Sequence, residues 1–239
     1  MRIWVGTSGF GYKEWRGKFY PERFSAKEML RFYASRFAAV EINNSFYRLP
    51  KETVLRSWSE QVPPEFRFVL KAPRIITHTK RLKDAGAEVE DLFSVIKALG
   101  SNQSAILFQL PPNFKKDVER LQTFLCLLPA DRQVAFEFRH SSWFTDEVYA
   151  LLNQFHAGFV INASPHFPSR EMITDQIMYI RFHGPGKLYN SLYSQEQLQT
   201  WADKIRPQLA QHAVYGFFNN TFAGQALQNA NELRDLLSQ

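Results

Sequence analysis

The sequence contains a single cysteine, Cys126, among its 239 residues. This excludes an intrachain disulfide. Cys126 lies in the segment LQTFLCLLP, whose apolar residues have helical spacing, and it has no basic neighbour in sequence to activate it. We therefore expect Cys126 to be a small residue of the hydrophobic core and not a catalytic thiol.

Long hydrophobic runs are also missing, because no segment approaches the ~20 apolar residues needed to cross a bilayer. The opening residues, MRIWVGTSGF, lack the charged region, apolar core and small-residue cleavage site of a secretory signal. A cytoplasmic protein without a membrane partner is therefore expected. The early glycines Gly6, Gly9 and Gly11 do not have the spacing of a dinucleotide-binding loop, which argues against a Rossmann domain.

Acidic residues are outnumbered, with 23 Asp and Glu against 29 Lys and Arg, giving a formal net charge of +6. This balance favours anionic partners but is also compatible with dispersed surface charge. The hydrophobic content of 45% and the 22 phenylalanines indicate a globular chain with a full core.

Short apolar segments recur along the chain and nearly all are followed by segments with helical spacing. The predicted strands are residues 3–6, 39–43, 66–70, 105–109, 133–138, 158–162, 178–182 and 214–218. The predicted helices are residues 25–37, capped by Ser25 and Glu28, then 51–61, 89–99 closed by Gly100, 116–128, 145–156, 194–211 and 224–237, with a short or absent helix between the sixth and seventh strands. Eight strand and helix units in about 240 residues predict a single α/β domain, residues 1–239, folded as a TIM-type (β/α)8 barrel.

Polar side chains follow the predicted strands, and the segment VAFEFRHSSWF is the strongest example. Side chains alternate along a strand, so Glu137 and Arg139 share a face with Ala135, while Phe136 and Phe138 share the other. A buried Glu and Arg in this position form either a structural ion pair or part of a site.

The recurrence of such endings on other strands favours a shared site, because active groups of TIM barrels gather at the carboxyl ends of the strands. The candidates at this mouth are Thr7, Glu41, Asn43, Lys71, Gln109, Glu137, Arg139, Arg181, His183 and Asn219, with His140 beside them. Three of them are cationic and two anionic, so a net positive mouth that binds an anionic small molecule is expected.

Two loops combine aromatic or basic residues that could contact a polyanion. Residues 10–21, FGYKEWRGKFYP, interleave aromatics, Tyr12 and Trp15 among them, with basic residues, and residues 71–83 form the densest basic segment. Weak nucleic-acid binding without sequence preference is one interpretation. The other, slightly favoured for residues 10–21, is an ordered loop that packs over one end of the core.

Several of these segments together resemble the YecE-like family, the domain-of-unknown-function family seventy-two. The matching segments are VGTSGFGYKEWRGKFYP, VEINNSFYRLP, KAPRIITHTKRL, LFQLPPNF, EFRHSSWF, YIRFHG and VYGFFNN. They are spread over the whole chain. The resemblance implies a TIM-type barrel and brings no established reaction.

Four functions remain open from the sequence. Glu137 could act as an acid or base, as in a hydrolase or lyase, with Lys71, Arg139, Arg181 and His183 binding the substrate. Alternatively, Glu41, Glu137, His183 and His140 could hold a divalent metal for phosphodiester hydrolysis, although the nearby cations disfavour it.

Paired carboxylates of a glycosidase are the least favoured enzyme, since Glu41 and Glu137 are expected to lie far apart around the ring. A pure binding protein is the fourth possibility.

No cofactor and no tightly bound metal are expected. Replacing Arg181 with Met is expected to weaken anion binding while leaving the fold intact. The sequence does not determine the substrate or the oligomeric state.

Overall fold

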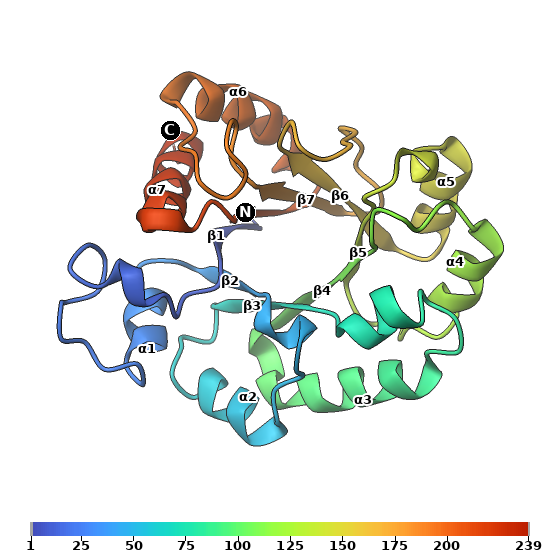
Figure 1. Cartoon of the computed structure of the whole chain (residues 1–239), viewed down its shortest axis with the longest axis horizontal. Coiled ribbons are helices and arrows are strands. Elements are labelled where there is room, and N and C mark those ends of the chain that lie inside the picture. Colours follow the sequence, from blue (N-terminus) through green and yellow to red (C-terminus); the bar gives the residue numbers. More distant parts are fainter. Residues whose placement is uncertain (1, 239) are drawn as a thin grey trace.

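The computed structural model describes residues 2–238, which form a closed barrel of eight parallel strands in sequence order (Figure 1). The strands are β1 (Ile3–Ser8), β2 (Ala39–Ile42), β3 (Arg67–Lys71), β4 (Gln103–Gln109), β5 (Val134–Glu137), β6 (Ala157–Ala163), β7 (Ile177–Phe182) and β8 (Ala213–Phe218). The register pairs Trp4 of β1 with Tyr215 of β8, and this pairing closes the ring. The predicted barrel fold is confirmed.

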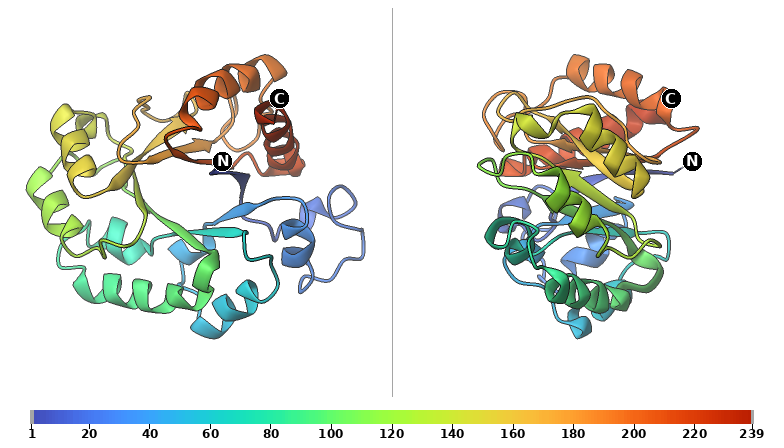
Figure 2. Two further views of the ribbon diagram at one scale, coloured as in Figure 1. Left: turned by 180° about the vertical axis from the view of Figure 1, so that it is seen from behind. Right: turned by 90° about the vertical axis from the view of Figure 1, so that its right-hand side faces the viewer.

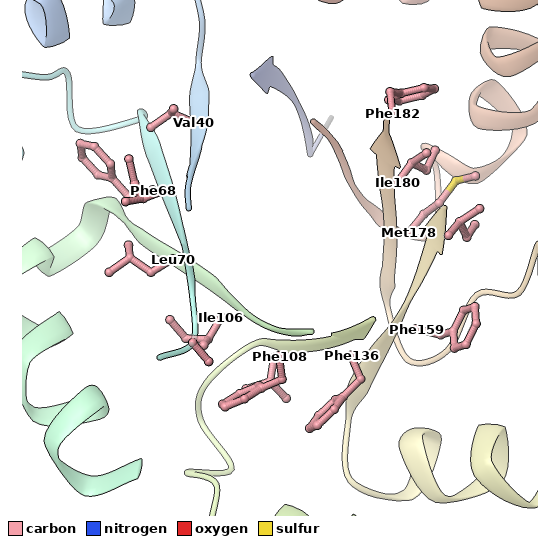
Figure 3. Close-up of a cluster of buried hydrophobic side chains, with 14 of the residues drawn as sticks. Val40, Phe68, Leu70, Ile106, Phe108, Phe136, Phe159, Met178, Ile180 and Phe182 are labelled. Carbon is pink, nitrogen blue, oxygen red and sulfur yellow. The ribbon is translucent and has the colours of Figure 1, made fainter. Parts of the chain in front are cut away.

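The strands form because their sequences are apolar on both faces, as expected for a parallel sheet covered on both sides. Outward-facing side chains such as Phe68, Phe108 and Phe136 are fully buried between the strands and the helices (Figure 3). A smaller set of residues fills the barrel, including Ala105, Leu107 and the stacked rings of Trp4 and Tyr215. Fully burying each large apolar side chain contributes roughly 1.5–3 kcal/mol.

The helices lie outside the ring of strands, as Figures 1 and 2 show from three directions. They are α1 (Met29–Ala34), α2 (Glu52–Ser59), α3 (Gly86–Ile96), α4 (Val118–Leu125), α5 (Asp146–Gln154), α6 (Gln195–Ile205) and α7 (Gln225–Leu237). Two of them begin at a side-chain cap: Asp117 accepts from Arg120 N, and Ser194 forms a capping box with Gln197.

Residues 164–176, between β6 and β7, contain no helix, so the predicted degenerate unit is confirmed. This segment is tied to the barrel where Thr174 Oγ1 donates to the carbonyl of Ala157 at 2.7 Å. A connection without a helix leaves its side chains free to reach the mouth, and Phe167 does so.

Three local expectations are wrong. The helix predicted from Ser25 begins only at Met29, because the Ser25 hydroxyl accepts from Lys27 N in a turn and makes no capping box with Glu28. Cys126 is exposed because it is the C-terminal cap of α4 and lies past its buried face. Gly100 does not follow α3 directly, since a 3-10 segment at residues 97–102 intervenes and Gly100 has a φ of 54° within it.

The loop of residues 10–21 packs against the core. Trp15 and Tyr20 are buried, and Trp15 Nε1 donates to the carbonyl of Thr221 at 3.0 Å. This contact joins the loop after β1 to the loop after β8. In the described part of the chain, no helix is long and apolar enough to cross a membrane.

Candidate functional site

The strand ends place a layer of polar side chains inside the barrel mouth. Alternation along each strand directs these side chains toward the axis: Ser8, Glu41, Lys71, Gln109, Glu137, Asn162 and Arg181. The apolar interior residues lie one layer below them. The predicted face shared by Ala135, Glu137 and Arg139 is the inward one.

Arg181, which is 2% exposed, lies at the centre of this layer. Its Nε and Nη2 donate to the two oxygens of Glu41 at 2.9 and 2.7 Å, while Nη1 donates to Glu137 Oε2 at 2.6 Å. Glu41 also accepts from Ser8 Oγ at 2.6 Å and from Tyr179 OH at 2.7 Å. Burial lowers the pKa of Arg181, but the two carboxylates outweigh it and raise that pKa.

These contacts correct the expectation that Glu41 and Glu137 lie far apart, because both bind the same guanidinium. Burial would raise the pKa of Glu137, but Arg139 and Arg181 outweigh it and lower that pKa to about 2. Glu137 is therefore a carboxylate at neutral pH, without a proton to donate and with little tendency to accept one.

Arg139 follows β5 and turns back over the network. Its Nη2 forms an ion pair with Glu137 Oε1, and its guanidinium carbon lies 3.5 Å from the centre of the Phe167 ring. The residue is 8% exposed. Its buried Nε has no hydrogen-bond partner among the described residues, so Arg139 retains donor capacity that its own chain does not use.

His183 is fully buried beside Arg139. Its Nε2 lies 3.2 Å from Asn162 Oδ1, and its Nδ1 lies 3.2 Å from Asn219 Nδ2. Since the first partner accepts and the second donates, a neutral imidazole with its proton on Nε2 fits both contacts. Burial, reinforced by the charge of Arg181, lowers the pKa of His183.

Lys71 approaches the mouth from β3. Its Nζ donates to Gln109 Oε1 at 2.7 Å and lies 4.2 Å from the centre of the Phe46 ring. No carboxylate of the described residues lies within ion-pair distance of it. Burial, with a further contribution from Arg181, lowers the pKa of Lys71 to about 8.

The charges of this layer do not cancel. Lys71, Arg139 and Arg181 carry three positive charges when protonated, and Glu41 and Glu137 carry two negative ones, which leaves one positive charge. A buried surplus charge is costly unless a counter-ion offsets it.

The remaining predicted residues divide into two groups. Asn43, 3.4 Å from Arg181 Nη2, and Asn219 belong to the mouth, and Tyr12 reaches its edge by donating to the Ser8 carbonyl at 2.5 Å. His140 does not join the network, because its Nδ1 accepts from Ser142 N at the start of a 3-10 turn.

Trp15 is 0% exposed, so its ring packs in the core and offers no face to a ligand. Thr7 faces outward, with its hydroxyl 2.9 Å from Tyr33 OH, because β1 continues to Ser8 and Ser8 takes the inward position.

Sequence reasoning missed five residues of the mouth. Ser8 and Tyr179 could have been found from alternation, since each shares a face with an inward residue of its strand, and Asn162 ends β6 in the same way. Phe167 and Tyr189 come from loops, and their rings lie 5.2 and 5.7 Å from that of His183. No periodic signal marks them.

The donor set does not suit a metal. Both carboxylates are bound to guanidinium groups, and His183 Nε2 faces Asn162. Within residues 2–238, no group of three or more His, Cys, Asp or Glu side chains is arranged to hold a metal ion.

Comparisons with known proteins agree with this architecture. The family model described as "Protein of unknown function DUF72" matches residues 4–239. The UPF0759 protein YunF of Bacillus subtilis is 27% identical over 98% of this chain and 94% of its own length. The UPF0759 protein YecE of Escherichia coli K12 is 33% identical over 48% of this chain and 43% of its own.

Solved structures extend the comparison. The crystal structure of a DUF72 family protein from Thermotoga maritima superposes with a TM-score of 0.91 at 31% identity, with both chains fully covered. A D-psicose 3-epimerase has a TM-score of 0.57 at 8% identity over 100% of this chain and 97% of its own, which shows a common fold alone. The resemblance expected from the sequence is confirmed.

Proposed function

Because this chain belongs to the DUF72 family, whose name assigns no activity, its function has to come from the site, and we propose that the barrel mouth binds a small molecule through a carboxylate or phosphate. The observation that carries this proposal is Arg139, a buried arginine whose Nε lacks a partner among residues 2–238. It lies in a layer with one surplus positive charge. An anion would satisfy the donor and offset the charge together.

In this proposal Arg139 holds the anion, and Lys71, when protonated, adds to the positive charge of the layer. Arg181 does not hold the anion, because its Nε, Nη1 and Nη2 are all occupied by Glu41 and Glu137. The two carboxylates fix the guanidinium groups and transfer no protons, which revises the catalytic role that the sequence suggested for Glu137.

The rim of the mouth offers surfaces for the rest of the ligand. Phe46 lies against Lys71, Phe167 lies against Arg139, and Tyr189 is 41% exposed beside His183. Aromatic faces suit a sugar or another compact organic group. A phosphorylated or carboxylated metabolite fits this combination better than inorganic phosphate alone.

Titration calorimetry with pyruvate, dihydroxyacetone phosphate and inorganic phosphate tests the proposal. Arg139→Gln should weaken binding of the organic anions by about 10- to 100-fold, the range expected for losing a charge-assisted hydrogen bond. Arg74→Gln is the matched control, because Arg74 is exposed in the nearby loop and should leave the affinity unchanged.

Two outcomes would overturn the proposal: no saturable binding of any of these anions, or equal affinity in the wild-type protein and Arg139→Gln. A single-stranded oligonucleotide serves as comparator. If it alone binds, and the Arg74→Gln variant loses that affinity, the nucleic-acid interpretation replaces ours.

A further inference from the structure

We propose that Lys71 forms an imine with a carbonyl group of the anionic molecule held by Arg139, so that the mouth is a site for carbonyl compounds that carry a carboxylate or phosphate. This inference rests on the proposed function, because Arg139 has to hold the anion for the carbonyl carbon to meet Lys71 Nζ. It adds a covalent step that a simple anion-binding site does not need.

The surroundings of Lys71 are those of a nucleophilic amine. A buried lysine that serves only as a structural cation is paired with a carboxylate, as the partly buried Lys80 is with Glu88 at 2.7 Å. Lys71 Nζ instead contacts a neutral acceptor, Gln109 Oε1, and the face of Phe46. Lys71, Gln109 and Phe46 are each partly exposed, so this part of the mouth is not closed off from solvent.

The proton balance also suits this reaction. Attack on a carbonyl requires the neutral, unprotonated amine. Burial, together with Arg181, lowers the pKa of Lys71 to about 8. Relative to an ordinary lysine with a pKa near 10.4, the neutral fraction at pH 7 is larger by on the order of a hundredfold.

The step itself needs no further reactant. The nitrogen lone pair of Lys71 attacks the carbonyl carbon, and the carbonyl π electrons pass to oxygen, which gives a carbinolamine. Protonation of its hydroxyl and departure of water then form the C=N bond. Overall, an ammonium group and a carbonyl yield a protonated imine and one water molecule, so no net proton is exchanged with solvent.

The protonated imine retains the positive charge of Lys71, and Arg139 remains bound to the anion of the substrate. The layer beneath, in which Arg181 neutralises Glu41 and Glu137, does not change its charge during the step. The site is therefore compatible with both the reactant and the product of imine formation.

Reductive trapping tests this inference. The intact protein is incubated with pyruvate or dihydroxyacetone phosphate and sodium borohydride, and peptide mass spectrometry locates the resulting secondary amine. We expect Lys71 to be labelled at least about tenfold more than the exposed Lys27. This ratio is smaller than the roughly hundredfold difference between their neutral amine fractions. Lys71→Met should abolish the excess, and Lys27→Met should not.

Acetone, which has a carbonyl but no anion, separates the two proposals. Arg139→Gln should reduce trapping of pyruvate to the level of acetone. If calorimetry shows that pyruvate binds but Lys71 is not trapped in excess, the imine is wrong and anion binding stands. If acetone and pyruvate label Lys71 equally, the anion does not promote imine formation and the imine proposal is wrong, while the calorimetry alone decides whether the mouth binds anions. Circular dichroism checks that Lys71→Met folds, and Lys71→Arg provides a second variant that retains the charge and cannot be trapped.

Discussion

At the scale of single residues, Arg181 is the group on which the site depends most. Replacing it with Met would leave Glu41 and Glu137 buried without their shared partner, and removing one partner of a buried ion pair costs about 3–5 kcal/mol. We therefore expect Arg181→Met to destabilise the protein by at least this amount in urea unfolding. This replaces the expectation from sequence that the variant keeps its fold intact.

Arg56→Met is the matched control for this prediction. Arg56 forms an ion pair with Glu52 on the surface of α2, where both side chains are more than half exposed. Exposed pairs contribute little because water and salt screen them. Similar losses of stability in the two variants would contradict the central role of Arg181.

Glu137 gives the molecule a defined acid sensitivity. Its folded pKa of about 2 lies below the value of about 4.3 in an unfolded chain, so the unfolded state binds more protons in this range. The stabilisation is fully present above about pH 5 and is lost as the pH falls toward 2. It amounts to on the order of 3 kcal/mol.

Urea unfolding of the wild type and of Glu137→Gln across this range measures the effect. The wild type should be the more stable of the two at pH 6, and the difference should shrink steadily between about pH 4.5 and pH 2. Parallel curves over that interval would show that Glu137 does not titrate as its two arginine partners imply.

At the scale of elements, the loop between β7 and α6 shapes the side of the mouth formed by His183 and Tyr189. Gly184 has a φ of 99°, and an added Cβ would lie 2.6 Å from Ser191 Oγ and 3.0 Å from the Lys187 carbonyl. The bend lets Tyr189 N donate to the His183 carbonyl at 2.7 Å.

Gly184→Ala should therefore destabilise the protein by about 1–3 kcal/mol and weaken ligand binding at the mouth. Gly186→Ala in the same loop is the control, because its added Cβ would meet Ser191 Cβ at an ordinary 3.8 Å. Thermal unfolding and calorimetry of both variants check this. Equal behaviour of the two would mean that the bend at residue 184 is not required.

The elements were also the level at which sequence reasoning worked best. Alternation in VAFEFR placed Glu137 and Arg139 on the inward face, because a strand in a closed barrel has only two faces and one of them is fixed by Phe136 and Phe138. Element ends were less predictable. β1 extends two residues beyond its predicted end, to Ser8, and Ser8, which shares a face with the inward Trp4, is the inward group in place of Thr7.

At the scale of the whole molecule, eight strand and helix units were enough to predict the barrel, because parallel strands joined by helices have few ways to bury both faces. The pairing of charges was not predictable. Arg181 lies 140 residues from Glu41 and 44 from Glu137, and only closure of the ring brings them together. The sequence therefore indicated mutual repulsion of Lys71, Arg139 and Arg181, whereas in the fold both arginines are paired with Glu41 or Glu137.

The contacts of Arg181 also have a kinetic consequence. They join β7 to β2 and β5, so they form only after most of the ring has assembled, and interactions of such long range are expected to be absent from the folding transition state. Their loss should then appear in the rate of unfolding, with the rate of folding nearly unchanged. Stopped-flow measurements on Arg181→Met should therefore show a larger unfolding rate constant than in the wild type, with a similar folding rate constant. The charged layer would then determine the lifetime of the closed barrel.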